Sequence, residues 1–204
     1  HLSIRRQRQM CIRDRYKSPS FDIRKKDSSL NYIIIHYTAI KNYKEALSYL
    51  CDKKNKASSH FFISKSGEIY YIVDVMNRAW HAGRSSWKGK SDINSESIGI
   101  EIDNSGHHCN FENFNKQQIK SLLKLLDYIL LKFMISKHNI LGHSDVAPLR
   151  KKDPGEKFPW KELSNSKIGI WHRLKKRKLQ KYRRKKVNLN EKKFFFQCIP
   201  ARMC

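Results

Sequence analysis

The sequence predicts an α/β domain, with an α+β arrangement as the open alternative, in which helices pack on a β-sheet. Two apolar runs, residues 32–37 and 97–103, have the β-branched composition of buried strands. Two segments with apolar residues at helical spacing, residues 42–54 and 116–134, predict amphipathic helices. A chain of 204 residues suits one such domain with extensions.

Charge divides the chain into three parts. The net charge is +25, and much of it lies near the two ends of the chain, whereas the middle holds most of the apolar runs. We therefore predict a globular domain over residues 30–172. A basic arm at residues 1–29, disordered or adventitious, precedes it, and a basic extension at residues 173–204 follows it. Such an extension is either a solvated segment or a contact for a polyanion.

Composition excludes several classes of protein. No apolar run approaches the roughly 18–20 residues that span a bilayer, so we expect no transmembrane segment. No apolar stretch typical of a signal peptide follows the charged start, but the chain begins with His rather than Met, so this carries little weight for the compartment. The five cysteines are an odd number without a Cys-x-x-Cys pair, which argues against a disulfide framework and a cysteine zinc knuckle.

The first predicted strand, residues 32–37, ends with a histidine, His36. A histidine in this position is either a satisfied structural residue or a ligand. The helix predicted over residues 42–54 follows. Apolar residues 60–63 and 68–73 then flank a glycine-bearing turn, which predicts a β-hairpin.

The segment after the hairpin carries Trp80 and His81 among small residues. These two side chains either line a pocket or close the hairpin against the core. Residues 85–96 are polar, and we expect them to form a surface loop.

The strand predicted over residues 97–103 alternates three isoleucines on one face with Gly99, Glu101 and Asp103 on the other. A glutamate in a core strand is costly to bury unpaired. Either that face opens into a cleft, or Glu101 meets a cation. Gly99 beside it would leave room for a ligand.

The helix over residues 116–134 has a capping-box start at Asn115 and Gln118 and an apolar stripe that would pack on the sheet. A short strand over residues 139–141 leads into a polar loop at residues 142–155. Its prolines and glycines are incompatible with a regular helix.

The polar loop carries His143 and Asp153, and binding or catalytic groups often lie on such loops. Two imidazoles and one carboxylate, with His36 as the other imidazole, are a ligand set that suits zinc. Spacing alone does not select them, because the chain has nine histidines. A short helix at residues 158–163 and an apolar segment at 167–171 complete the domain.

Seven short blocks follow one another along residues 30–172. They are Ile-Ile-His-Tyr-Thr (34–38), Ser-Ser-His-Phe-Phe-Ile (58–63), Arg-Ala-Trp-His-Ala-Gly (78–83), Ser-Ile-Gly-Ile-Glu-Ile (97–102), Gly-His-Ser-Asp-Val-Ala-Pro (142–148), Lys-x-Asp-Pro-Gly (151–155) and Phe-Pro-Trp (158–160). Together they resemble the type-2 N-acetylmuramoyl-L-alanine amidases, the zinc amidases related to peptidoglycan recognition proteins. The resemblance implies a central mixed β-sheet flanked by helices, the peptidoglycan-recognition-protein-like amidase fold.

The resemblance also implies a zinc cofactor and the roles of five residues. The zinc ligands would be His36, His143 and Asp153, and the catalytic pair would be Glu101 and Lys151. The implied reaction is hydrolysis of the amide between N-acetylmuramic acid and L-alanine in peptidoglycan or muropeptides, during cell-wall turnover, recycling or lysis. Zinc would activate water, the glutamate would move its proton, and the lysine would stabilise the developing oxyanion.

Three further residues are candidates for substrate contact: His60, Trp80 and His81. For the two histidines, an equally open alternative is that they hold the hairpin by hydrogen bonds. Some relatives carry a tyrosine just before the histidine matched by His60, where this chain has Ser59, which fits the branch that uses a glutamate. We expect a bacterial monomer that acts in the cell envelope, in the periplasm above all, with the cytoplasm as the alternative.

Three other functions are weighed against this one. A non-catalytic peptidoglycan-binding module is the main alternative, and the intact ligand and catalytic sets argue against it. Specific nucleic-acid binding is indicated only by charge, without a recognisable motif. A cysteine hydrolase built on Cys109 with His107 or His108 would place its site in a polar loop.

Overall fold

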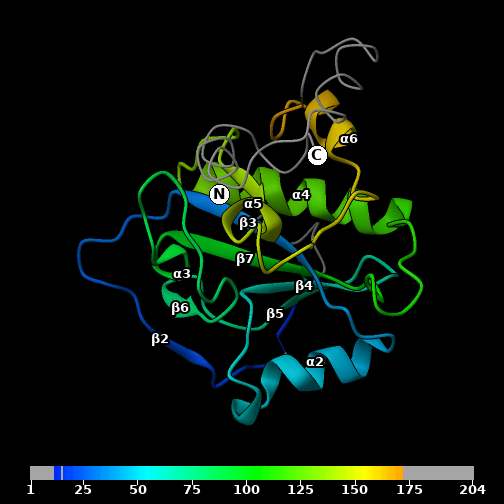
Figure 1. Cartoon of the computed structure of the whole chain (residues 1–204), viewed down its shortest axis with the longest axis horizontal. Coiled ribbons are helices and arrows are strands. Elements are labelled where there is room, and N and C mark those ends of the chain that lie inside the picture. Colours follow the sequence, from blue (N-terminus) through cyan, green and yellow to red (C-terminus); the bar gives the residue numbers. More distant parts are fainter. Residues whose placement is uncertain (1–11, 15, 172–204) are drawn as a thin grey trace.

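The structure is a computed structural model that describes residues 12–14 and 16–171 (Figure 1). Residues 1–11 and the predicted basic extension at 173–204 lie outside the described residues. The strands are β1 (Ile12–Arg13), β2 (Phe21–Ile23), β3 (Tyr32–Tyr37), β4 (Phe61–Ile63), β5 (Ile69–Tyr71), β6 (Asn77–Ala79), β7 (Ser97–Ile102) and β8 (Ile140–Gly142). The helices are α2 (Tyr43–Cys51), the short 3-10 helix η1 (Lys53–Asn55), α3 (Ile93–Glu96), α4 (Lys116–Lys132), α5 (His143–Val146) and α6 (Trp160–Asn165).

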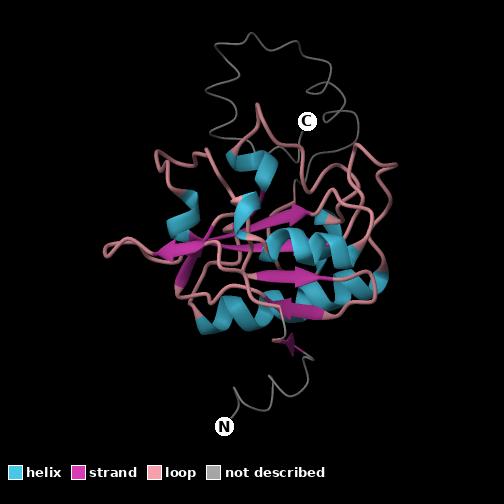
Figure 2. Ribbon diagram, turned by 90° about the horizontal axis from the view of Figure 1, so that it is seen from below, coloured by secondary structure: helices cyan, strands magenta, loops and turns pink. Residues whose placement is uncertain are grey.

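A mixed β-sheet forms the centre of the molecule. Within the described residues, six strands pair in the order β1-β5-β4-β7-β3-β8, and β2 pairs with β6 in a second, small sheet. Strands β4, β7, β3 and β8 are parallel, whereas β5 runs antiparallel to β4, as expected for the hairpin. Figure 2 shows these strands among the helices from a second direction. The predicted mixed sheet flanked by helices is confirmed.

The two faces of the sheet are covered by different helices. Helix α4 packs with Ile33, Ile35 and their neighbours on one face, and helix α2 packs with Phe62 and Tyr70 on the other. Alternation along each strand explains this division, because successive side chains point to opposite faces. Helix α4 begins at the predicted capping box, in which Asn115 and Gln118 bond each other's backbone.

The parallel pairing of β3 with β7 and β8 brings three chain segments to one edge of the sheet. His36 in β3 is the register partner of Glu101 in β7, so the two side chains leave the same face. Strand β8 pairs with β3 up to Gly142, and His143 follows directly. The carboxyl ends of parallel strands meet at one edge, which is where open α/β sheets place their sites.

Two predictions about loops are wrong in part. Residues 85–96 were expected on the surface, but they end in helix α3, where Ile93, Asn94 and Ser95 are buried. The polar side chains face inward because each has a partner there: Asn94 accepts from the backbone N–H groups of His81 and Ala82, and Ser95 donates to the Asp92 carboxylate. The loop over residues 142–155 begins with a single helical turn, α5, which forms because both prolines lie beyond it.

The prediction of a disordered or adventitious N-terminal arm is wrong for residues 16–29. Strand β2 pairs with β6, and the Tyr16 ring packs edge-on against Tyr70 at 5.5 Å.

Among the described residues, none of the helices combines the length and the apolar composition that a membrane span requires.

Arg24 fastens this N-terminal segment to the domain. Its guanidinium donates to four backbone carbonyls, one at Val75 and three within residues 94–97. The bonds run from Nε to Val75 (3.0 Å), from Nη1 to Asn94 (2.9 Å) and Ser95 (2.8 Å), and from Nη2 to Ser97 (2.9 Å). A guanidinium has five donors in a rigid fork, so one side chain can join several carbonyl groups.

Replacing Arg24 with Met removes these four hydrogen bonds. We expect Arg24→Met to lower the free energy of unfolding by about 2–4 kcal/mol, because several buried carbonyl oxygens lose their donor. Urea denaturation measures the change. Lys26→Met is the control, since Lys26 is an exposed cation two residues away, and its cost should stay below about 0.5 kcal/mol. Equal unfolding midpoints for the two variants would show that the segment does not stabilise the domain.

Candidate functional site

The three predicted ligand residues lie together, buried at the edge of the sheet. His36 comes from β3, His143 from the start of α5, and Asp153 from the loop beyond. The two Nδ1 atoms are 2.9 Å apart, and each lies 3.0 Å from Oδ2 of Asp153. The three atoms therefore form a nearly equilateral triangle that could hold a metal ion.

The triangle fits a small tetrahedral cation better than it fits hydrogen bonding. Protons on both Nδ1 atoms would point two N–H groups at each other across 2.9 Å. If one Nδ1 has no proton, it turns a lone pair toward the carboxylate oxygen. With an ionised Asp153, no placement of the ring protons therefore satisfies all three contacts of the triangle. A tetrahedron with zinc-like bond lengths has edges of about 3.3 Å, so the triangle needs only a small expansion to become one of its faces.

The electrostatics of the cluster also favour a cation. Burial, with a smaller contribution from the neighbouring His143, lowers the pKa of His36 to about 4. Burial alone would raise the pKa of Asp153, but hydrogen bonds with His143 and His36 outweigh it and hold this pKa well below its usual range. At neutral pH the pocket thus offers a neutral His36 imidazole and a negative carboxylate, the forms that bind a metal.

The outer nitrogen of each imidazole has its own partner. His143 Nε2 lies 3.0 Å from the carbonyl oxygen of Ala82. A carbonyl only accepts, so Nε2 carries the proton and Nδ1 presents its lone pair to the cluster. His36 Nε2 lies 3.0 Å from Nδ1 of His81. Metal-binding histidines commonly donate their other ring N–H in this way.

Glu101 lies beside the cluster with a carboxylate oxygen left over. Its Oε2 is buried and has no hydrogen-bond partner among the residues that the structure describes. Burial raises the pKa of Glu101 to about 8, with Asp153 adding to the rise and Lys151 opposing it. A carboxyl group with such a pKa can take up and release a proton near neutral pH.

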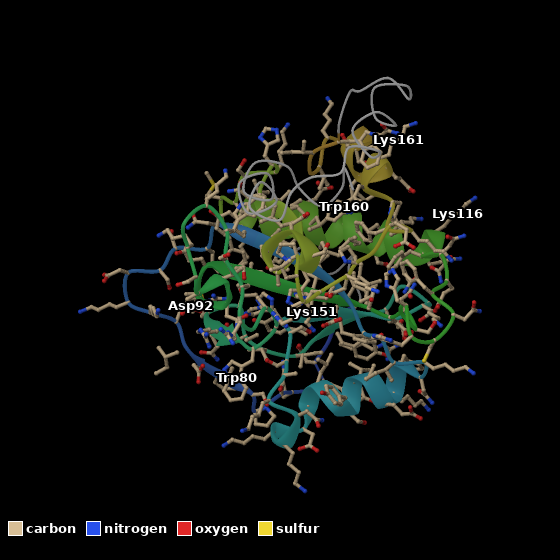
Figure 3. All side chains as sticks on the ribbon, in the orientation of Figure 1. Trp80, Asp92, Lys116, Lys151, Trp160 and Lys161 are labelled. Atoms are coloured by element: carbon tan, nitrogen blue, oxygen red, sulfur yellow. The ribbon has the colours of Figure 1, made fainter. Side chains whose placement is uncertain are left out.

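Lys151 is half-buried in the loop between two of the candidate ligands, His143 in α5 and Asp153. Figure 3 labels Lys151 near the middle of the view. Its backbone N–H bonds the carbonyl of Ala147 at 2.9 Å. The preceding Arg150 fastens this loop, because its Nη2 donates to the carbonyls of Ala82 and Arg84, each at 2.8 Å. Lys152, in contrast, is exposed.

The structure separates the three candidates for substrate contact. His60 is fully buried, and its Nδ1 accepts the backbone N–H of Gly99 at 2.9 Å. This placement favours the alternative in which His60 holds the hairpin. Trp80 is half-buried and donates its indole N–H to Asp22 at 2.7 Å, so part of its ring stays available to a substrate.

His81 occupies the space that the sequence assigned to a ligand beside Gly99. A Cβ atom on Gly99 would lie only 2.4 Å from Cγ of His81, so the glycine makes room for this ring. The His81 side chain is buried against His36, and the expectation of an open space beside Gly99 is wrong.

Two residues near the cluster were missed from the sequence. Asn94 accepts the backbone N–H groups of His81 (3.2 Å) and Ala82 (2.7 Å) through Oδ1, and Ser97 lies 3.2 Å from Nε2 of His81. Both sit in or just after a polar stretch that looked solvated. No sequence signal distinguishes an inward-facing Asn or Ser there.

A cavity of about 830 Å³ lies between the start of α2 and the β4–β5 turn. Asp103 lines it, two residues beyond Glu101 and on the same face of the strand. Burial raises the pKa of Asp103 to about 6, and Lys65 opposes this rise. The cavity also presents Lys41 and Lys44, so charges of both signs meet there.

Sequence comparison finds a family and named relatives. Residues 26–156 match the family described as N-acetylmuramoyl-L-alanine amidase. The N-acetylmuramoyl-L-alanine amidase AmiD of Escherichia coli is 36% identical over 154 residues, which cover 70% of this chain and 55% of AmiD. The 1,6-anhydro-N-acetylmuramyl-L-alanine amidase AmpD of Haemophilus influenzae is 31% identical over 168 residues, covering 74% of this chain and 89% of AmpD. The chain thus spans about half the length of AmiD.

Solved structures give a similar result. The complex of E. coli AmiD with anhydro-N-acetylmuramic acid-L-Ala-D-gamma-Glu-L-Lys aligns with a TM-score of 0.65 and 31% identity, over 80% of this chain and 67% of that one. AmpDh3 from Pseudomonas aeruginosa aligns with a TM-score of 0.68 and 29% identity, over 87% and 78%. These likenesses confirm the fold that the sequence resemblance implies.

Zinc added to the metal-free protein should raise its unfolding temperature. At a hundredfold excess over Kd, linkage adds about 2.7 kcal/mol, or about 5–10 °C for a domain of this size. In Asp153→Asn the cluster loses its negative charge, and we expect the zinc-induced shift to vanish in differential scanning calorimetry. Glu156→Gln, an exposed carboxylate three residues along the same loop, is the control and should keep the shift. A full shift in Asp153→Asn would place the zinc elsewhere.

Proposed function

The chain belongs to the N-acetylmuramoyl-L-alanine amidase family, and we propose that it is a zinc-dependent amidase of the bacterial cell wall. Its reaction would be hydrolysis of the amide between N-acetylmuramic acid and L-alanine in peptidoglycan or muropeptides. The observation that carries this proposal is the meeting of a metal-competent triangle with Glu101 and Lys151 at one edge of the sheet.

His36, His143 and Asp153 would hold the zinc ion through the three atoms of the triangle. When bound, zinc would supply Lewis acidity that activates water and polarises a carbonyl group. The protein contributes burial, a neutral His36 and a carboxylate that keeps its charge. These features support a dry site in which charges act strongly.

Glu101 would carry the proton of the reaction. Its unpartnered Oε2 is available to the attacking water, and its pKa lies near the working pH. The carboxylate would accept the water's proton and then give it to the amine nitrogen of L-alanine as the amide bond breaks. General acid–base catalysis of this kind is most efficient when the pKa of the group matches the ambient pH.

Lys151 would stabilise the negative oxygen that develops on the scissile carbonyl. Its positive charge already acts on Glu101, which places it within electrostatic reach of the reacting groups. The bonds of Arg150 to Ala82 and Arg84 hold the loop that presents it. A cation fixed in advance needs no rearrangement when the charge appears.

The cavity beside Asp103 would receive the stem peptide. It continues the face that carries Glu101, and its lysines, Lys41, Lys44 and Lys65, suit peptide carboxylates. Asp103 suits an amine. The half-buried Trp80 would line the site at the side of β2 and β6. Action in the cell envelope by a monomer, with polyanion contact through the basic extension, completes the proposal.

Replacing either catalytic residue should abolish most activity without loss of zinc. We expect kcat/KM for release of stem peptide to fall about a hundredfold to ten-thousandfold in Glu101→Gln and about a hundredfold to a thousandfold in Lys151→Met. Chromatography of muropeptide digests measures the release, and metal analysis verifies that zinc is retained. Lys152→Met, the exposed neighbour, is the matched control and should keep its activity.

Two results would count against this proposal. Full activity in Glu101→Gln would remove the assigned proton carrier. A native, zinc-loaded protein that binds muropeptides and releases no peptide would favour the non-catalytic peptidoglycan-binding module.

A further inference from the structure

The proposed reaction leaves His81 without a role. Its ring lies behind His36, on the side away from the metal triangle, with the ring centroids 5.1 Å apart at a steep angle. His36 Nε2 and His81 Nδ1 are 3.0 Å apart, and both side chains are buried. The close fit against Gly99 keeps the His81 ring in this place.

The backbone carbonyl of Ile93 determines which atoms donate along the series of hydrogen bonds from Ser97 through His81 to His36. The carbonyl oxygen of Ile93 only accepts, so the Ser97 hydroxyl donates to it. Having used its proton, Ser97 Oγ accepts from Nε2 of His81 at 3.2 Å. A neutral imidazole carries one ring proton, so Nδ1 of His81 is left as an acceptor.

The consequence reaches the metal triangle through His36. Because His81 Nδ1 accepts, the proton of His36 lies on Nε2. Its Nδ1 then presents a lone pair to the point between His143 and Asp153. The opposite tautomer would place two lone pairs together at the contact with His81 and spend the Nδ1 proton on Asp153.

We propose that His81 and Ser97 are positioning residues that fix the tautomer of His36 with Nδ1 free to bind the metal. The proposal rests on the proposed zinc site and deepens it. It gives His81 a purpose other than substrate contact, and it explains why a serine precedes the isoleucines of β7. Ser97 is itself buried, and its backbone carbonyl accepts from Arg24.

The second imidazole is oriented from the same stretch of backbone. The carbonyl of Ala82 accepts from His143, one residue after His81. Asn94 Oδ1 binds the backbone N–H groups of both His81 and Ala82. Both histidine ligands therefore take their tautomer from one dipeptide, which helix α3 holds in place.

A matched pair of substitutions separates this role from simple space filling. Asn and Leu have nearly the same size and shape, but the amide oxygen of Asn can replace His81 Nδ1 as an acceptor. We expect His81→Leu to weaken zinc binding about 10–100-fold, the usual cost of removing the partner of a metal-binding histidine. His81→Asn should stay close to the native affinity. Competition with a chromophoric chelator measures both, and His138→Leu, an exposed histidine, controls for loss of a histidine elsewhere.

A spectroscopic measurement reports the tautomer directly. In metal-free protein labelled with ¹⁵N-histidine, long-range ¹H–¹⁵N spectra show which ring nitrogen of His36 is protonated. We expect Nε2–H in the native protein and in His81→Asn, and a mixture of tautomers in His81→Leu. Ser97→Ala should also give a mixture, and it serves as the test if His81→Leu does not fold.

Equal zinc affinities for the Asn and Leu variants would overturn the proposal, as would a native His36 protonated on Nδ1. Neither readout involves amide hydrolysis. Absence of amidase activity in a native protein that binds zinc and shows Nε2–H would therefore refute the proposed function while leaving this inference intact.

Discussion

The structure depends on holding three electron-rich atoms together inside the protein. Two imidazole nitrogens and a carboxylate oxygen lie 2.9–3.0 Å apart, in an arrangement that ring protons cannot satisfy. Only the rest of the fold keeps them there. The register of β3 with β7 and β8 fixes the positions of His36 and of the segment that begins with His143. Arg150 fastens the loop that carries the Asp153 carboxylate. A cation at the centre would turn this repulsion into binding.

Much of the fold could be predicted because apolar patterning records burial directly. The runs predicted at residues 32–37 and 97–103 are the core strands β3 (Tyr32–Tyr37) and β7 (Ser97–Ile102), and the capping box at Asn115 begins the long helix. The same reasoning failed where polar residues face inward. Arg24 and Asn94 bond backbone groups far away in sequence, and a polar segment with such partners reads like a solvated one. Residues 16–29 and α3 were therefore missed.

At the site, the sequence predicted which residues lie together but not how their side chains are oriented. The blocks around His36, His143 and Asp153 predicted a cluster that the structure brings together, although its metal and the catalytic roles stay proposals. The His81 ring packs against His36 and the His60 ring packs against His81, but spacing along a chain does not say which way a ring points. Both are buried behind the cluster, and the glycine that was expected to admit a ligand admits His81.

Diffraction from crystals of the zinc-loaded protein at the zinc absorption edge tests the central claim most directly. We expect one anomalous peak per chain, about 2.0–2.2 Å from Nδ1 of His36, Nδ1 of His143 and an oxygen of Asp153. Glu101 and Lys151 should lie beside the peak without binding it. A peak at another group of residues, or an empty triangle in protein that retains zinc, would contradict the assignment of this cluster as the metal site.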